Sequence, residues 1–431
     1  MIEPLREDGL SHQVVGPSKP RLLEVLGPGL ITGASDDDPS GIATYSQAGA
    51  QFRYGLTWTL LFTYPLMVVI QEISARIGRA SGRGIAGNLR RYYPNWLLQG
   101  IVVLLLLANT INIGADLAAM GEVLGLFLPG PRQAYILLFG LGCVAMQVLL
   151  KYSRYVRVLK WLSLSLFAYF GTLVTARVSW GDLARSFFIP PIAWQPDYFT
   201  TIVAVFGTTI SPYLFFWQAS QEAEDIRDIP ARDPLVVAPE QAPQAVQRIR
   251  IDTCLGMAFS NLVALAIMVT AAATLNVAGT THVETAAQAA EALRPIAGDL
   301  AYLLFALGVI GTGLLAIPVL AGSAAYAIGE ARKWPVGLQR KPREAKAFYA
   351  TVAVATLLGA AANVVGINPI KALFLTAVIN GVAAVPVMVC MMLMSSRNEV
   401  MGPVVISRPL RVIGWLATAA MAASVLAMAL V

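Results

Sequence analysis

Three consecutive acids are the residues of this chain whose type and position most clearly suggest chemistry. Asp36, Asp37 and Asp38 stand in the sequence SDDDPSG, with strongly apolar residues on both sides. A carboxylate inside a membrane span costs roughly 2.5–3.5 kcal/mol even on a mild insertion scale, so such a cost indicates a functional role. The alternative is that the three acids are solvated at the mouth of a short re-entrant segment.

A second polar interruption, GTTISPY at 207–213, lies within another apolar stretch. It supplies the hydroxyl groups of Thr208, Thr209 and Ser211, together with a proline. Proline removes a helical hydrogen bond, and Asp, Ser and Thr offer the freed backbone groups other partners, so we expect both stretches to be unwound. Unwound backbone at membrane depth is tolerated only where it is buried or lines a cavity.

Carboxylates, hydroxyls and freed carbonyls form an oxygen-only ligand set, which hard divalent ions prefer. Mg²⁺ sheds water reluctantly and suits a site with small residues such as Gly41 and Ser211, although Ca²⁺ stays open. His12 and His282 are the only histidines, and both lie in polar segments. A soft-metal site built from Met, Cys and His is therefore disfavoured.

Two further acids fall in the apolar stretch at 96–118 and just beyond it. Asp116 lies deep enough to be costly unless it faces an aqueous path. Glu122 is nearer the end of this stretch, and we expect it to be solvated.

The elements that position these residues are membrane-spanning helices. Hydrophobic residues make up 57% of the 431 residues and charged residues only 13%, which is far from the soluble norm. A bilayer-spanning helix needs roughly 20 apolar residues, and the chain offers about eleven such stretches. We expect spans at 25–50 (interrupted), 56–77, 96–118, 134–151, 155–177, 198–221 (interrupted), 249–275, 299–326, 346–366, 369–394 and 410–430.

The two interruptions fall in the first and sixth spans, five spans apart. Broken helices at matching positions of two halves are typical of inverted-repeat transporters, which bind substrate where the breaks meet. We therefore predict an all-α polytopic membrane protein with two five-helix repeats and an appended eleventh helix. Its predicted parts are a cytoplasmic tail (1–24), the first repeat (25–177), the second repeat (178–394) and the eleventh helix (395–431).

Basic residues indicate the orientation, because cytoplasmic loops carry excess Lys and Arg. With the N-terminus inside and the C-terminus outside, about 25 of the 31 Lys and Arg residues fall on the cytoplasmic side. We expect a multi-pass protein of the cell membrane, with no cleavable signal peptide. The net charge of +6 needs no nucleic-acid partner.

The remaining polar stretch, Glu222 to Arg250, is predicted to be a mobile surface loop. Cys143, Cys254 and Cys390 share no metal-binding spacing, so neither a disulfide framework nor a zinc site is indicated. No cofactor is expected, and we expect a monomer.

The motifs GPGLITGASDDDPSG and GTTISPY, in this order of spans, resemble the Nramp divalent-metal transporters over nearly the whole chain. That resemblance implies a LeuT-like fold and a metal site at the two breaks. The family reads Asp-Pro-Gly-Asn at the first break and Met-Pro-His at the sixth. Matched motif to motif, its metal-binding Asp is Asp38, its Asn is Gly41, its Met is Ser211 and its His is Tyr213.

Three of these four positions depart from the family pattern, and the departures resemble the Nramp-related magnesium transporters. That branch implies a largely hydrated Mg²⁺ held by Asp37 and Asp38, with Asp116 and Tyr213 along its route. The family's proton-coupling histidines correspond to Tyr213 and Gln218, which do not titrate near neutral pH. We therefore expect uncoupled Mg²⁺ import driven by the membrane potential, with Mn²⁺ as a further possible substrate.

Other functions stay open at this point. The first is a proton-coupled Mn²⁺ or Fe²⁺ transporter of ordinary Nramp type, which Ser211 and Tyr213 weaken. An amino-acid transporter on the same fold usually leaves the first break uncharged, and three acids speak against it. A channel or a membrane-embedded enzyme is disfavoured because no filter-like repeat and no motif such as HExxH appears.

Overall fold

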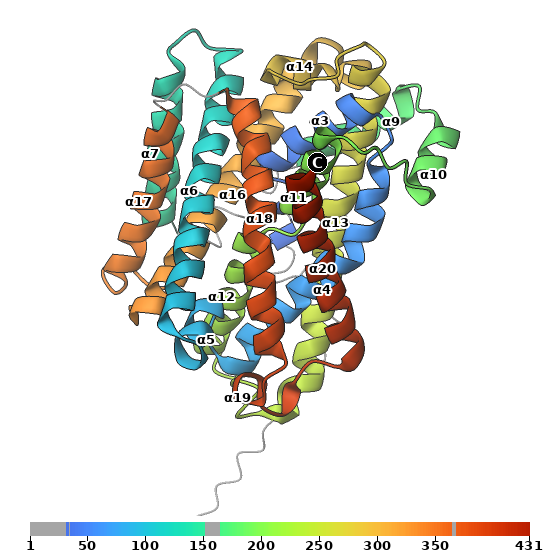
Figure 1. Cartoon of the computed structure of the whole chain (residues 1–431). Helices are drawn as coiled ribbons and strands as arrows, with labels where there is room; N and C mark the ends of the chain where they lie inside the picture. Colours follow the sequence, from blue (N-terminus) through green and yellow to red (C-terminus); the bar gives the residue numbers. More distant parts are fainter. Residues whose placement is uncertain (1–31, 34, 151–163, 364–367) are drawn as a thin grey trace, which may run out of the picture.

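The computed structural model describes residues 32–33, 35–150, 164–363 and 368–431. These residues form a bundle of long helices joined by shorter ones, with no strand among them (Figure 1). The apolar composition explains this outcome, because in a bilayer every backbone polar group must be paired within the protein and a helix does so locally.

The helices are labelled as in Figure 1. They are α3 (Pro39–Phe52), α4 (Thr57–Ser81), α5 (Ile85–Tyr92), α6 (Asn95–Gly125), α7 (Arg132–Leu149), α9 (Phe167–Thr175), α10 (Trp180–Phe188), α11 (Pro196–Thr209), α12 (Pro212–Asp228), α13 (Ala242–Ala271), α14 (Ala286–Glu291), α15 (Arg294–Ala297), α16 (Ala301–Arg332), α17 (Lys346–Ala362), α18 (Pro369–Ser395), α19 (Asn398–Met401) and α20 (Arg408–Leu430). A π-helical turn, Ala272–Asn276, follows α13.

Each predicted span overlaps at least one of these helices. Eight helical stretches in the described ranges are long and apolar enough to cross a membrane, counting α11 and α12 as one, and α17 is a shorter apolar helix. The other two predicted spans are described only in part, as α3 and α9. Residues 25–31 and 155–163 of these spans, and the predicted tail 1–24, lie outside the described residues.

Small residues set how closely the helices pack. A Cβ on Gly207 of α11 would lie 1.9 Å from the carbonyl oxygen of Ala377 in α18. A Cβ on Gly49 of α3 would lie 2.2 Å from the carbonyl oxygen of Met268 in α13. Because lipid tails are as apolar as the side chains, such close backbone contact is a main source of attraction between helices in a membrane.

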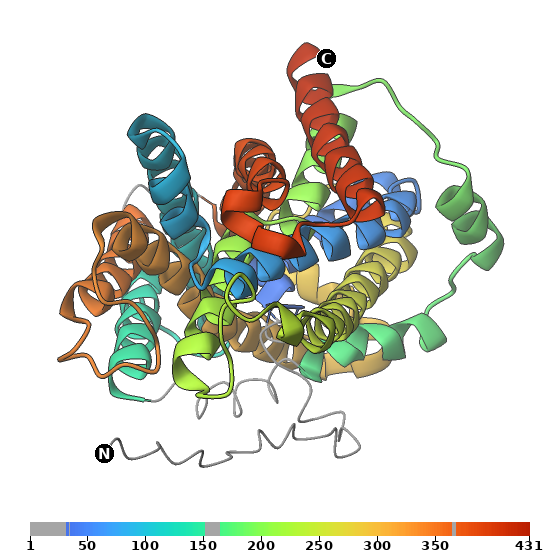
Figure 2. The same ribbon diagram turned by 90° about the horizontal axis from the view of Figure 1, so that it is seen from below.

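The two ends of the bundle carry different elements. Helices α5 and α19 lie at one end, and α14 and the C-terminus lie at the opposite end (Figure 1). Seen from below, α10 and α20 lie at the edge of the bundle (Figure 2). Helix α20 packs against α18, α11 and α4.

The prediction of a mobile loop from Glu222 to Arg250 was wrong. Helix α12 continues to Asp228, and Glu222 and Glu224 are buried. The connection that follows is fixed by backbone hydrogen bonds, such as the one from Leu235 N to the carbonyl of Arg79 at 3.2 Å. The charged residues were misread because they pair within the protein: Arg248 of α13 forms an ion pair with Glu222.

Candidate metal-ion site

The first interruption is present where the sequence predicts it. Residues 35–36 are helical, Asp37 and Asp38 are not, and α3 starts at Pro39. Proline fits the first turn of a helix because it lacks the N–H that would have no partner there. Asp38 is the N-cap of α3, and its Oδ1 accepts hydrogen bonds from Gly41 N at 2.8 Å and Ser40 Oγ at 2.7 Å.

The other carboxylate oxygen of Asp38 is held from a different span. Asn112 of α6 donates its Nδ2 hydrogen to Asp38 Oδ2 at 3.0 Å. Gly41 keeps this region compact, because a Cβ there would come within 3.3 Å of both the Asp36 carbonyl oxygen and the Tyr45 ring. The carboxylate of Asp38 is therefore fixed in position by partners on two helices.

Asp36 and Asp37 turn toward a third helix. The hydroxyl of Ser260 in α13 donates to Asp36 Oδ2 and lies 3.3 Å from Asp37 Oδ1. Both acids are only 1% exposed, and Asp36 Oδ1 and Asp37 Oδ2 have no hydrogen-bond partner within the described part of the chain. Buried carboxylate oxygens are seldom left without partners, so these two atoms are available to a cation or its water.

The second interruption separates α11 from α12 at Ile210 and Ser211. The hydroxyls of Thr208, Thr209 and Ser211 each hydrogen-bond to carbonyls of the preceding turn; Ser211 Oγ lies 2.6 Å from the Gly207 oxygen. These hydroxyls therefore pair with backbone carbonyls near the break, and their oxygens keep lone pairs that can accept further bonds.

Two hydrogen bonds join the two broken spans close to their interruptions. Tyr213 of α12 donates its hydroxyl to the carbonyl of Ser35 at 3.1 Å, just before the first break. The hydroxyls of Thr208 and Tyr45 lie 2.9 Å apart, which links α11 to α3. The two breaks are therefore neighbours, as the substrate-binding geometry of broken-helix transporters requires.

Asp116 lies one helical turn beyond Asn112 on α6 and is completely buried. Neither of its carboxylate oxygens has a hydrogen-bond partner in the described ranges. Glu122, expected to be solvated, is instead partly buried, and its Oε1 accepts from Ala286 N at 2.8 Å. That prediction was wrong because the end of α6 is covered by the segment that starts α14.

The carboxylates do not converge on one point. Within the described residues, no group of three or more His, Cys, Asp or Glu side chains has a metal-holding arrangement. Asp38 faces Asn112, whereas Asp36 and Asp37 face Ser260.

Sequence reasoning missed Asn112 and Ser260. For Asn112 a signal existed, because Asn109, Asn112 and Asp116 are spaced three and four residues apart and so share one helix face. For Ser260 the sequence offers no such signal, because a lone serine is common in membrane spans.

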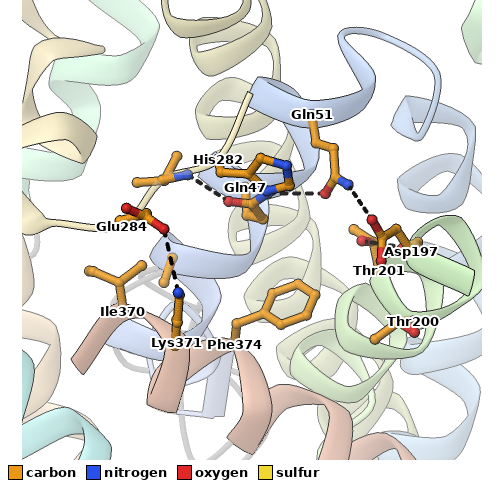
Figure 3. A pocket seen from close by; sticks show the side chains of 12 residues that line it. Gln47, Gln51, Asp197, Thr200, Thr201, His282, Glu284, Ile370, Lys371 and Phe374 are labelled. Atoms are coloured by element: carbon orange, nitrogen blue, oxygen red, sulfur yellow. Dashed lines mark hydrogen bonds and ion pairs between the residues drawn. The ribbon is translucent and has the colours of Figure 1, made fainter. Parts of the chain in front are cut away.

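A cavity of about 220 Å³ lies at the ends of α3, α11 and α18 that are remote from the breaks (Figure 3). Gln51 of α3 donates to Asp197 of α11 at 3.2 Å, and Lys371 of α18 pairs with Glu284 at 3.4 Å. His282 also lines this cavity. Because α3 and α11 both run from the cavity to the interruptions, we call the cavity the vestibule of the candidate site.

Comparisons with known proteins agree with this architecture. The family profile described as "Natural resistance-associated macrophage protein-like" matches residues 29–431. A "Divalent metal cation transporter MntH" of Deinococcus radiodurans is 27% identical over 412 residues, which is 92% of this chain and 87% of that protein. A protein of the same name from Klebsiella pneumoniae is 26% identical over 408 residues, 92% of this chain and 91% of its own length.

Solved structures share the fold. The Eremococcus coleocola manganese transporter superposes with a TM-score of 0.74 at 16% identity, covering 95% of this chain and 87% of that one. The inward-facing structure of Mhp1 gives 0.54 at 14% identity, covering 94% and 90%. These matches confirm the predicted all-α, LeuT-like fold. Because the family profile covers nearly the whole sequence, the chain belongs to the Nramp (natural resistance-associated macrophage protein-like) family.

Proposed function

We propose that the chain is a secondary transporter that imports a divalent metal ion across the cell membrane. The observation that carries this proposal is the group of carboxylate oxygens of Asp36, Asp37 and Asp116, near the paired breaks, that have no hydrogen-bond partner among the described residues. Buried negative charge needs a compensating cation, and oxygen ligands suit a divalent one. The names of the relatives, divalent metal cation transporter and manganese transporter, support the same class of substrate.

Within that class we propose Mg²⁺, carried with much of its hydration shell, with Mn²⁺ as a competing substrate. The site residues are Asp37, Asp38 and Gly41 at the first break and Thr208, Thr209 and Ser211 at the second. Every side-chain donor among them is an oxygen, which favours a hard ion. The carboxylates point in different directions, and an ion that keeps its waters can reach them through those waters.

The ion's route passes Asp116 and Tyr213. Asp116 is aligned with Asn112 on one face of α6, so its free carboxylate can attract the ion toward Asp38. The phenol of Tyr213 bridges the two interruptions, so its bond to Ser35 must loosen for the ion to move between the half-helices.

We propose that this transport is not coupled to protons. The positions of the family's histidines hold Tyr213 and Gln218. Gln218 accepts a hydrogen bond from Gln71 and donates to Thr253 at 3.1 Å, so both the oxygen and the nitrogen of its carboxamide are engaged. Neither a phenol nor a carboxamide exchanges a proton readily at neutral pH.

The orientation completes the proposal. The N-terminus and the end of the bundle with α5 and α19 face the cytoplasm, and the C-terminus faces outside. The basic residues Arg90, Arg91 and Arg397 at that end agree with the excess of positive charge on cytoplasmic surfaces. In this orientation the vestibule opens on the outer side and receives the ion. We propose a monomer as the working unit.

A proton-coupled Mn²⁺ or Fe²⁺ transporter is the second candidate, favoured by the manganese transporters among the structural relatives. Flux into proteoliposomes separates the two. For the proposed function, Mg²⁺ enters, and millimolar Mg²⁺ suppresses Mn²⁺ uptake without a pH change inside. Mn²⁺ uptake that resists millimolar Mg²⁺ and acidifies the lumen would support the second candidate. Absence of any divalent flux would contradict both.

A further inference from the structure

A second cavity, of about 190 Å³, lies at the end of the bundle that carries α5. Its walls come from the turn between α4 and α5, from α12 and from the end of α16. Four basic side chains line it: Arg83, Arg90, Arg227 and Lys333. Space for about six water molecules at roughly 30 Å³ each is enough for a phosphate group.

The cavity contains one acid, and that acid is already engaged. The carboxylate of Glu330 accepts hydrogen bonds from Gly84 N at 3.0 Å and Gly87 N at 2.8 Å, at the start of α5. Arg90 donates to the backbone carbonyl of Glu330. Glu330 thus occupies the N-terminus of α5, where a helix favours negative charge.

The other three cations have no such partner. In the described part of the chain, Arg83, Arg227 and Lys333 form no ion pair within 4.0 Å. Four basic side chains and the single carboxylate of Glu330 together leave a surplus of three positive charges around one small cavity. A general excess of basic residues on the cytoplasmic side explains their number but not their convergence from three separate elements.

We propose that this cavity binds a phosphate group. Guanidinium and ammonium groups converging on one space form the usual recognition site for phosphate, and basic pockets between helices at the cytoplasmic surface bind anionic headgroups. The phosphate comes either from an anionic lipid or from a soluble phosphate compound. The indole of Trp334, which also lines the cavity, offers an apolar surface beside it.

Binding there would act on the transport cycle. Arg227 is on α12, which begins at the second interruption, whereas Arg83 and Lys333 belong to the α4–α5 turn and to the end of α16. A phosphate held by all three side chains would tie the inner end of α12 to its neighbours. Such a ligand would favour the conformation in which these elements are together.

The test compares two double variants that each remove two positive charges. Arg227→Gln with Lys333→Gln changes the cavity, whereas Lys341→Gln with Arg343→Gln changes the nearby loop that does not line it. The readout is the thermal unfolding midpoint of the full chain, which rises when a ligand binds the folded state. One arm adds pyrophosphate in neutral detergent without divalent metal, and the other adds phosphatidylglycerol to the same neutral detergent micelles.

We expect at least one ligand to raise the midpoint of the wild-type chain. The cavity pair should need about tenfold more of that ligand for the same rise, because two charge-assisted contacts are lost. The loop pair should behave like the wild type. A response to pyrophosphate alone identifies a soluble phosphate, and a response to phosphatidylglycerol alone identifies a lipid.

Three outcomes would overturn the proposal: no response to either ligand, no difference between the cavity pair and the wild type, or equal losses in both pairs. Equal losses in both pairs would mean that binding depends on the overall charge of the protein and not on this cavity. Both altered side chains of the cavity pair are exposed, so the fold should be retained; Arg83→Gln provides an independent single variant. The readout is binding, so the result does not depend on which ion the chain transports.

Discussion

Asn112 of α6 and Asp38 at the start of α3 are joined by a 3.0 Å hydrogen bond that spans two helices. The bond holds Asp38 Oδ2 in place, while Oδ1 caps α3 through Gly41 N and Ser40 Oγ. Asn112 therefore positions the carboxylate that we propose as a metal ligand. The relationship also connects the third span to the first break.

We predict that Asn112→Leu weakens the apparent affinity for the transported ion by about tenfold or more, because a hydrogen bond to a charged group contributes about 1.5–3 kcal/mol. Concentration dependence of Mg²⁺ uptake into proteoliposomes measures this effect. Gln99→Leu, on the same helix but far from the break, should leave the affinity unchanged. An unaltered affinity in the Asn112 variant would mean that Asp38 needs no support from α6.

The carboxylate of Asp38 is expected to be indispensable. Asp38→Ala should abolish divalent transport, and Asp37→Ala should reduce it strongly, because each removes a proposed ligand. Asp38→Ala also removes the cap of α3, at a cost of about 1 kcal/mol. Asp38→Asn keeps a capping oxygen, so it should lose transport with an unchanged unfolding midpoint. Undiminished Mg²⁺ flux in either Asp38 variant would remove the proposed site.

The sequence predicted the interruptions well because their cause is local. Proline opens the helix where Asp, Ser or Thr stand beside it, and the breaks at Asp37–Asp38 and Ile210–Ser211 fall inside the predicted stretches. By contrast, Pro65, Pro318 and Pro386 have mostly apolar neighbours and lie inside continuous helices. The family resemblance then identified the LeuT-like arrangement. The local sequence does not predict which distant side chain contacts each carboxylate. Ser260, which contacts Asp36 and Asp37, is an example.

The two wrong predictions, the mobile loop from Glu222 to Arg250 and the solvated Glu122, both concern charged residues. The burial of a charged residue depends on its tertiary partners. Glu222 looks like a loop residue in the sequence, yet Arg248 neutralises it inside the protein. Glu122 looks solvated, yet the segment that starts α14 covers it. A carboxylate's surroundings are set by elements far away in the chain, and hydropathy alone does not reveal them.

The identity of residue 211 should decide between hard and soft ions. Ser211→Met introduces a thioether at the position that the family resemblance matches to methionine, and soft ligands favour transition metals over Mg²⁺. We expect Mn²⁺ and Cd²⁺ uptake to rise relative to Mg²⁺ uptake in competition assays. Ser211→Ala removes the hydroxyl without adding sulfur and should not produce that change. If both variants show the same selectivity, residue 211 does not select the ion.

Close packing of α11 against α18 should make Gly207 sensitive to substitution. A Cβ at this position would lie 1.9 Å from the Ala377 carbonyl oxygen, so Gly207→Ala forces the helices apart. Overpacking typically costs about 1–3 kcal/mol, and the unfolding midpoint in detergent should fall accordingly. Gly142→Ala in α7 is the matched control, because nothing lies within 4 Å of its added Cβ. An equal midpoint in the two variants would contradict the packing described for α11.

Membrane potential, without a proton gradient, should suffice to drive uptake. A doubly charged ion gains roughly 4.6 kcal/mol per 100 mV, which is a large driving force on its own. In proteoliposomes loaded with K⁺, valinomycin makes the lumen negative, and Mg²⁺ uptake should then increase strongly while a luminal pH dye stays constant. Liposomes without protein control for leakage. Luminal acidification that requires both the protein and the divalent ion would show proton coupling, and the roles assigned to Tyr213 and Gln218 would then be wrong.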